Sequence, residues 1–435
     1  MGLPGNDLFL GDAGRAKFPL MKLSCNPADR PRHLRFITLC GAMVLASTLS
    51  CEGIPTSTEG PFLLSVTPAS TLLVGVGATV QFEAEVIPSE TAAAAMTAEE
   101  SVTINWSSGN PAVATVSAGG VATAVATGTT LVTANATGFG SGTATLEVWV
   151  PPEVESYEAG ETHFGRASYT EYVVGDLPII ISAPHGGAMV PEEITDRTYG
   201  TTVRDTNTQE LSRSIREALI ELTGRAPHMI VSRLRRIKLD PNREITEAAQ
   251  GNPFAENAWS EFQGSIEVAA EIVTRDFGSG LYLDIHGHGH DIARVELGYL
   301  LSRNDLTQSD VTLNVPSLVA KSSVRALAGT VDISFAKLIR GPASLGALLQ
   351  QRGTRSVPST ADPDPDGGAY FSGGYNTKRH GSRDGGTISG IQLEHHFPGL
   401  RDTVQNRNAY ATMLADALVV YLEAQFGLTV SGPGS

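Results

Sequence analysis

Three histidines separated by single glycines follow a short apolar run within Leu281–Asp291. The apolar run Leu281–Ile285 is bounded by glycine and predicts a buried strand. His286, His288 and His290 then occupy every second position. Side chains at the carboxyl end of such a strand point into the crevice where open α/β sheets hold their ligands. Neutral imidazole is the commonest metal ligand, and the whole chain has only 10 histidines. We therefore expect a metal site here rather than a polar turn that happens to be rich in histidine.

Residues that could complete this site lie where other predicted elements meet the same edge. A strand expected over residues 177–183 leads to His185, and a helix expected over residues 205–222 opens with Asp205. Zinc hydrolases commonly use two histidines and one carboxylate and leave a position for water. We predict His185, Asp205 and His286 as the metal ligands, with zinc as the ion.

The identity of each ligand has alternatives. An aspartate at the start of a helix is often only a cap, in which case Glu192 or Glu193 would supply the carboxylate. Either His288 or His290 could take the place of His286, or donate to an oxyanion. Imidazole and carboxylate donors also suit manganese, iron or cobalt.

A second set of residues fits the binding and activation of a substrate. A strand expected over residues 388–393 runs into Glu394, whose carboxylate could act as general base on a metal-bound water. Asn242 and Arg243 follow an earlier strand, and the planar guanidinium of an arginine matches both oxygens of a carboxylate. The alternative for both charged residues is an ordinary surface position. The glycine-rich loop expected to close over the substrate contains Gly373, Gly374 and Thr377.

Taken in order, these motifs resemble the N-formylglutamate amidohydrolase family and span most of residues 177–401. The segments that carry the resemblance are Pro184-His185-x-Gly187, Asp205-Thr206, Asp240-x-Asn242-Arg243, Asp284-x-His286, Phe371-Ser372-Gly373-Gly374-Tyr375 with Thr377 and Gly381, and Gln392-Leu393-Glu394. The resemblance implies a metal-dependent amide hydrolase with the mixed central sheet of the zinc carboxypeptidase and phosphorylase/hydrolase type. The roles that it implies are zinc ligands at His185, Asp205 and His286, a clamp for a substrate carboxylate at Asn242 and Arg243, and a water-activating base at Glu394. The run of three histidines departs from the family's single histidine.

Composition bounds the class of protein. With 435 residues, 41% hydrophobic and 18% charged, the chain has room for two or three globular domains. Its net charge of −15 argues against a nucleic-acid partner, which needs a basic patch. The three cysteines are Cys25, Cys40 and Cys51, so the body of the chain has no cysteine for a disulfide, a metal site or a nucleophile.

The N-terminal region predicts export. Arginines precede an apolar segment at residues 36–49 that ends just before Cys51. This arrangement resembles a bacterial lipoprotein signal, in which Cys51 is lipidated and anchors the protein to the membrane of the cell envelope. An ordinary secretory signal cut near Ser50 is the alternative. We assign residues 1–51 to the export segment and residues 52–61 to a polar tether.

Residues 62–150 predict a β-sandwich. They are rich in Val, Thr, Ala and Gly, contain no Lys or Arg, and alternate with period two in stretches such as 79–86. Trp106 is the expected core aromatic. Residues 106–116 and 119–129 resemble the bacterial Ig-like domain of group 2, which implies a spacer or adhesion module at the cell surface.

Residues 153–428 alternate between strand and helix patterns, as in an α/β layer fold. Further strands are expected over residues 228–232 and 296–302, and further helices over 255–277, 331–352 and 402–426. The sequence thus predicts an exported metal-dependent amidohydrolase acting on a carboxylate-bearing small molecule or peptide, such as an N-acyl amino acid, a glutamyl peptide or a cell-wall peptide. The alternative is a surface lipoprotein that binds metal or mediates adhesion without catalysis. The oligomeric state is not indicated.

Overall fold

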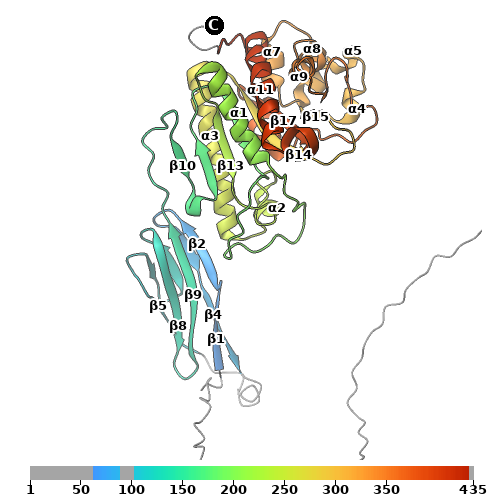
Figure 1. The fold of residues 1–435 in the computed structure, drawn as a ribbon. Coiled ribbons are helices and arrows are strands. Elements are labelled where there is room, and N and C mark those ends of the chain that lie inside the picture. The colour runs from blue at the N-terminus through green and yellow to red at the C-terminus, as the bar shows by residue number, and fades with distance from the viewer. Residues whose placement is uncertain (1–61, 89–101, 431–435) are drawn as a thin grey trace, which may run out of the picture. The chain divides into compact units, whose positions relative to one another are not determined.

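The computed structural model describes residues 62–88 and 102–430. The predicted export signal and all three cysteines lie outside these residues. The described chain forms a β-sandwich followed by an α/β domain with a mixed sheet, which confirms the predicted fold class (Figure 1).

The β-sandwich encloses one apolar cluster. Its four-stranded sheet has the order β2-β9-β8-β5, its three-stranded sheet has the order β3-β7-β6, and β1 pairs with β4. The prediction of Trp106 as core aromatic is wrong, because Phe82 is the buried aromatic at 1% exposure and Trp106 only packs against it from the edge strand β5. The strands are β1 (Phe62–Thr67), β2 (Ser70–Val74), β3 (Thr79–Gln81), β4 (Glu83–Pro88), β5 (Ile104–Ser108), β6 (Ala114–Val116), β7 (Val121–Ala124), β8 (Gly128–Ala136) and β9 (Gly140–Trp149).

The α/β domain is built on an eight-stranded sheet with the order β10-β11-β13-β12-β14-β17-β15-β16. Strands β13, β12, β14 and β17 run parallel, whereas β11 and β15 run antiparallel to their inner neighbours. The bounds are β10 (Thr162–Phe164), β11 (Thr170–Val173), β12 (Ile179–Ala183), β13 (His228–Ser232), β14 (Gly280–His288), β15 (Val295–Gly298), β16 (Ser356–Val357) and β17 (Ile388–His396). Strand β15 is shorter than predicted and β17 is longer, and the edge strands β10 and β16 and the inner strand β11 were not predicted.

The helices differ from the prediction mainly where the chain carries turn residues. One helix was expected over residues 331–352, but Gly341 and Pro342 separate α8 from α9, since proline cannot continue a helix. The bounds are α1 (Thr208–Thr223), α2 (Ile245–Ala249), α3 (Pro253–Phe277), α4 (Arg303–Leu306), α5 (Asp310–Leu313), α6 (Pro316–Lys321), α7 (Arg325–Thr330), α8 (Phe335–Arg340), α9 (Leu345–Gln351), α10 (Tyr375–His380) and α11 (Val404–Tyr421).

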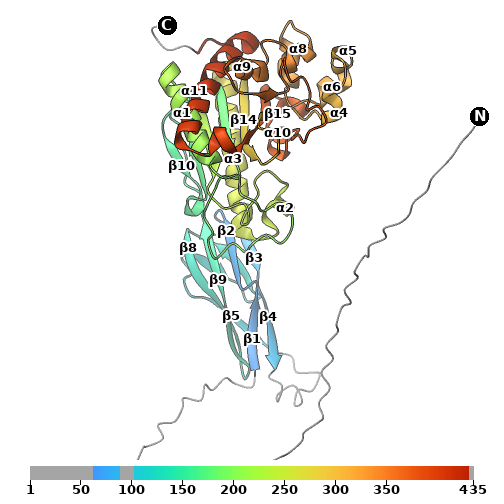
Figure 2. The ribbon, with the colours of Figure 1, turned by 45° about the vertical axis from the view of Figure 1, so that its right-hand side comes forward.

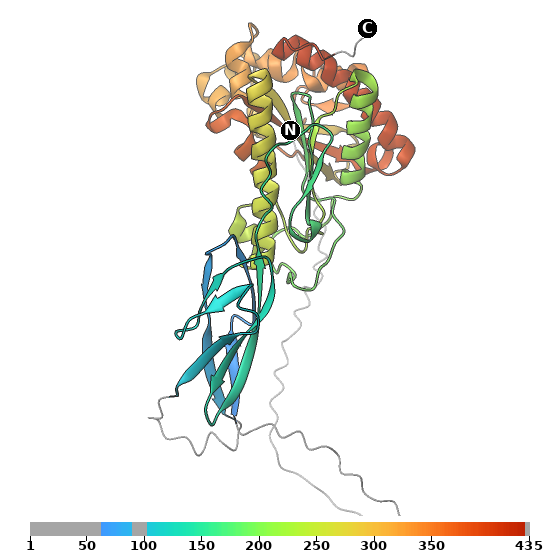
Figure 3. The ribbon, with the colours of Figure 1, turned by 90° about the vertical axis from the view of Figure 1, so that its left-hand side faces the viewer.

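The two faces of the central strands have different roles. Side chains alternate along a strand, so Leu281, Leu283 and Ile285 of β14 share one face and pack in the main core with α1, α9 and α11. Helices α1 and α11 lie side by side there (Figure 2). Tyr282 on the opposite face packs against α3. Helix α3 is the long yellow helix in Figure 3. Further along that second face β14 carries His286. The polar side chain of His286 therefore lies beyond the apolar contact between Tyr282 and α3.

Candidate metal centre

The structure brings His185, Asp205 and His286 together, and we call these three residues the primary group. His185 follows β12, Asp205 precedes α1, and His286 lies near the carboxyl end of β14. Oδ2 of Asp205 lies 3.4 Å from Nδ1 of His185 and 3.3 Å from Nδ1 of His286. Two ligands at ~2.0–2.1 Å from a tetrahedral zinc ion are ~3.3 Å apart. These spacings are long for hydrogen bonds but suit the edges of a metal coordination shell.

Each imidazole of the primary group is held from its far side by a second carboxylate. Nε2 of His185 lies 2.6 Å from Oδ1 of Asp240, and Nε2 of His286 lies 2.8 Å from Oδ2 of Asp284. An ionised carboxylate only accepts, so each Nε2 carries the proton and donates it. A metal ion in this group would take the place of the proton on each Nδ1. Without an ion, burial is outweighed by Asp284 and Asp205, which raise the pKa of His286 and so favour a proton on its Nδ1 as well. Such outer carboxylates fix the tautomer and orientation of metal-binding histidines.

The charges around the primary group favour a bound cation. Burial opposes ionisation of Asp205, but His185 and His286 outweigh it and hold its pKa well below the usual range. Burial is likewise outweighed at Asp240, whose pKa is lowered by His185 and by Arg236. At Asp284 burial is outweighed by His286, so the pKa of this carboxyl is also lowered. Three carboxylates thus surround two imidazoles, and this donor set fits a divalent ion.

Glu394 lies on the same sheet face as the primary group. It pairs with His286 across β14 and β17, and directly opposed side chains on neighbouring strands lie about 5 Å apart at Cβ. Its Oε1 accepts a hydrogen bond of 2.9 Å from Nε2 of Gln392, while its buried Oε2 has no partner. Burial raises the pKa of Glu394 to about 8; His286 opposes the rise, and the nearby carboxylate of Asp205 adds to it. Positive charge at the primary group would favour the ionised form that a general base needs.

The predicted substrate-binding residues divide into two sets. Asn242 is buried, lies 3.3 Å from Nε2 of His286 through its Nδ2, and accepts a hydrogen bond from the backbone N–H of Asn376. Gly374 packs so closely on Asn242 that an added Cβ would lie 2.5 Å from Nδ2. In the same loop, Gly373 has a φ of 113°, and Oγ1 of Thr377 lies 3.5 Å from Oε1 of Gln392. The loop is therefore joined to the primary group and to the partner of Glu394.

Arg243 is placed differently. Its side chain is 34% exposed, and its Nε lies 3.2 Å from Oε1 of Glu247. Its guanidinium also donates to the carbonyl oxygen of Asn242 at 2.7 Å. Among the described residues, no hydrogen bond or ion pair joins this guanidinium to the primary group, so its role as a carboxylate clamp stays a prediction.

The structure places the alternative carboxylates in different surroundings. Asp205 does not cap α1, because the helix begins after Asn207 and the Asp205 side chain faces the imidazoles. Glu192 is exposed, and Glu193 accepts a hydrogen bond from the hydroxyl of Tyr169. Neither glutamate lies in the primary group.

The other two histidines of the run lie apart from the primary group. His288 and His290 lie in a different group with Glu296, which leaves His286 as the histidine of the run that faces Asp205. The roles of Asp240, Asp284, Gln392 and Glu296 were missed by sequence reasoning. Asp284 and Gln392 gave a signal, because residues two apart on a strand share a face. Asp284 precedes His286 by two residues, and Gln392 precedes Glu394 by two.

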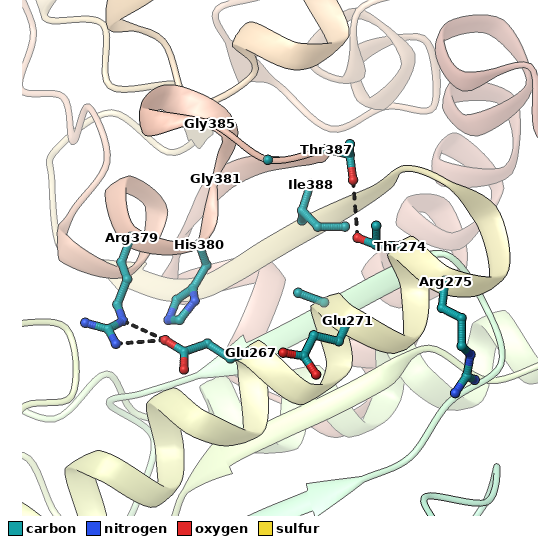
Figure 4. A pocket seen from close by; sticks show the side chains of 12 residues that line it. Glu267, Glu271, Thr274, Arg275, Arg379, His380, Gly381, Gly385, Thr387 and Ile388 are labelled. Atoms are coloured by element: carbon teal, nitrogen blue, oxygen red, sulfur yellow. Dashed lines mark hydrogen bonds and ion pairs between the residues drawn. The ribbon is translucent and has the colours of Figure 1, made fainter.

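The surface hollow in Figure 4 lies away from this centre. It has a volume of about 560 Å³ and is lined by α3 and by residues 379–388, where Glu267 pairs with Arg379 and Thr274 contacts Thr387. Ile388, at its edge, precedes Glu394 by six residues on β17, a span of ~20 Å along a strand. This hollow therefore contributes no residue to the candidate site.

Comparisons with known proteins give two kinds of similarity. Residues 64–148 match the model of the bacterial Ig-like domain (group 2), a domain typical of extracellular or surface proteins. The crystal structure of N-formylglutamate amidohydrolase from Ralstonia eutropha JMP134 is similar, with 14% identity, a TM-score of 0.35, and coverage of 57% of this chain and 93% of that chain. Gene product Atu2144 from Agrobacterium tumefaciens is similar with 11% identity, a TM-score of 0.37, and coverage of 60% and 98%.

The surface layer protein SbsC, domains 1–6, is similar over 22% of this chain and 14% of that chain, with 18% identity and a TM-score of 0.17. The predicted similarity to N-formylglutamate amidohydrolase structures and to the Ig-like domain is thus found. No match is found among curated proteins. Within the described residues, no helix has the length and apolar character that a membrane span requires.

Proposed function

We propose that the α/β domain is a metal-dependent hydrolase that cleaves an amide bond of a carboxylate-bearing substrate. The observation that carries the proposal is the spacing of the primary group, 3.3 and 3.4 Å between Asp205 and the two imidazoles, beside a separate carboxylate, Glu394, that has one unpartnered oxygen. A divalent ion held by this group supplies Lewis-acid chemistry, which activates water as a nucleophile and polarises a carbonyl. Zinc is the ion that we propose.

In this proposal each protein group has a distinct task. Glu394 takes the proton of the attacking water on Oε2 and returns it to the leaving amine. Gln392 holds the other oxygen of Glu394 and so fixes the direction in which the base points. Asn242 and the loop with Gly373, Gly374 and Thr377 position the substrate. Arg243 releases Glu247 and pairs with the carboxylate of the substrate instead. Substrates of this kind are N-acyl amino acids, glutamyl peptides and cell-wall peptides.

The test compares Glu394→Gln with wild type in the full chain loaded with zinc. Release of free amine is measured on N-formyl, N-acetyl and γ-glutamyl amino acids, together with metal content. We expect the variant to keep its metal and to lose at least about 100-fold in rate, the contribution typical of a general base. Glu192→Gln, an exposed glutamate, is the matched control and should retain activity.

Two outcomes would contradict the proposal. Turnover that survives in Glu394→Gln would remove this residue as the base. A metal-loaded wild type that cleaves none of the substrate classes would favour the alternative of a metal-binding surface protein without catalysis.

We also propose that the protein is exported and lipid-anchored through Cys51. The apolar segment before Cys51 and the Ig-like domain at residues 64–148 support this proposal. In a bacterial host, labelled palmitate should be incorporated into the wild type and not into Cys51→Ala, and the variant should leave the membrane fraction. An unlabelled wild type recovered outside the cells would instead indicate an ordinary secretory signal.

A further inference from the structure

A second cluster of metal-ligand residues lies beside the primary group. His288 ends β14, His290 lies two residues further on, and Glu296 is in β15. One ligand atom from each of these residues lies within 4.8 Å of those of the other two. His288 and Glu296 are buried, and the side chain of His290 is 22% exposed. We call these three residues the secondary group.

The sheet register places the secondary group next to Glu394. Glu394 pairs with His286 on one side and with Glu296 on the other, so the three side chains form a row on one face of β14, β17 and β15. Strands lie about 4.8 Å apart, which separates the backbones of His286 and Glu296 by about 10 Å. Two buried glutamates thus stand directly opposite each other in this row, and both can be ionised only when positive charge balances them.

The positive charge close to Glu296 is incomplete. Nε of Arg294 lies 3.5 Å from Oε1 of Glu296 and makes no hydrogen bond to it. Oε2 of Glu296 accepts a hydrogen bond of 2.9 Å from the backbone N–H of Phe371. The buried Oε2 of Glu394 has no partner. A further cation near Glu296 would therefore be electrostatically favoured.

The histidines of the secondary group are prepared to bind such a cation. Nε2 of His288 donates to the carbonyl oxygen of Arg294 at 2.8 Å, so its lone pair is on Nδ1. Nδ1 of His290 lies 3.0 Å from Oε1 of Glu296, near the ~3.3 Å that separates two ligands of a tetrahedral zinc ion. The ring of His290 stacks on Phe371 with centroids 4.6 Å apart, which limits its rotation.

Two internal hydrogen bonds must be exchanged when the ion binds. The backbone N–H of His290 donates to Nδ1 of His288 at 3.1 Å, and Gly289 between them has no neighbour within 4 Å of its Cβ position, so this loop has room to shift. The proton between His290 and Glu296 moves to Nε2 of His290, which is the other neutral tautomer. No co-reactant is required.

We propose that His288, His290 and Glu296 form a second binding site for a divalent ion, separate from the primary group. Two imidazoles and one carboxylate suit zinc or another late first-row metal. This site goes beyond the proposed hydrolase function and does not depend on it. The run of three histidines is then divided, with His286 in the primary group and the other two in the second site.

The experiment measures bound zinc per chain by elemental analysis. The full chain is stripped with chelator, reloaded with zinc, passed through a desalting column, and checked for folding by circular dichroism. We expect about two ions in wild type and about one each in His290→Ala and His185→Ala. Glu296→Gln should also bind about one. His163→Ala removes a histidine that lies in neither group and should keep about two.

The outcomes separate this proposal from the hydrolase. One ion in wild type that is retained in His290→Ala and lost in His185→Ala would overturn the second site and leave the primary group intact. One ion that is lost in His290→Ala and retained in His185→Ala would support the second site and contradict the primary one. If His290→Ala fails to fold, Glu296→Gln gives the same comparison.

Discussion

The outer carboxylate Asp284 offers a graded test of the primary group. It is fully buried, and it accepts from Nε2 of His286 at 2.8 Å and from Oγ of Ser182 at 2.5 Å. In Asp284→Asn the amide oxygen can still accept from His286, whereas the negative charge and the hydrogen bond accepted from Ser182 are lost. In Asp284→Ala the buried N–H of His286 loses both the charge and its acceptor.

The expected effects follow from this difference. Loss of an outer partner typically weakens metal binding 10–100-fold, so we expect about 10-fold for Asp284→Asn and about 100-fold for Asp284→Ala. These losses equal about 1.4 and 2.7 kcal/mol. The zinc dissociation constant is measured by competition with a chromophoric chelator, after circular dichroism has shown that each variant is folded.

Asp276→Asn changes an exposed carboxylate at the end of α3 and should leave the dissociation constant unchanged. Equal zinc affinity in wild type and in both Asp284 variants would show that His286 is not a metal ligand held by this carboxylate. Because a second ion could mask the change, the titration is done in the His290→Ala background.

Two further predictions concern pH and packing. Burial lowers the pKa of His228 from 6.5 to about 4; the unfolded chain alone takes up this proton between those values, so the free energy of unfolding should fall by about 3 kcal/mol as pH drops from 6.5 to 4. The free energy of unfolding, measured with urea at several pH values, should depend less steeply on pH in His228→Asn than in wild type. An equally steep dependence in the variant would contradict the assignment to His228. Gly374→Ala puts a Cβ against Asn242 and should destabilise the fold by about 1–3 kcal/mol, whereas Gly264→Ala, which meets no atom within 4 Å, should not.

The sequence predicted the convergence of His185 and His286 because both follow apolar runs that read as parallel strands. The carboxyl ends of such strands meet at one edge of a sheet, whatever the intervening chain does. The outer carboxylate Asp240 could not be found this way. It lies in the loop between β13 and α2, which has no periodic pattern, and only the tertiary path of that loop brings it to 2.6 Å from His185.

Helix ends were predicted less well for a related reason. Asp205 has the residue type of a cap, but Asn207 occupies the cap position in a left-handed conformation with a φ of 68°. Sequence alone cannot show that an aspartate near a helix start faces away from the helix, because capping is a local preference and the two imidazoles that attract Asp205 are distant in sequence. The contact with the two imidazoles, and not the local capping preference, therefore sets the direction of the Asp205 side chain.

The spacing of the histidines in the run His286, His288 and His290 does not show which of them bind the same ion. Two histidines separated by one residue on a strand share a face, so spacing alone allows His286 and His288 to hold the same ion. Their partners separate them: His286 faces Asp205 through Nδ1 and Asp284 through Nε2, whereas His288 contacts the backbone of Arg294 and His290. To share the ion of His286, the ring of His288 would have to turn away from the backbone groups of Arg294 and His290 that hold it. The division of the run is thus set by the hydrogen bonds of each ring, and not by the spacing of the histidines.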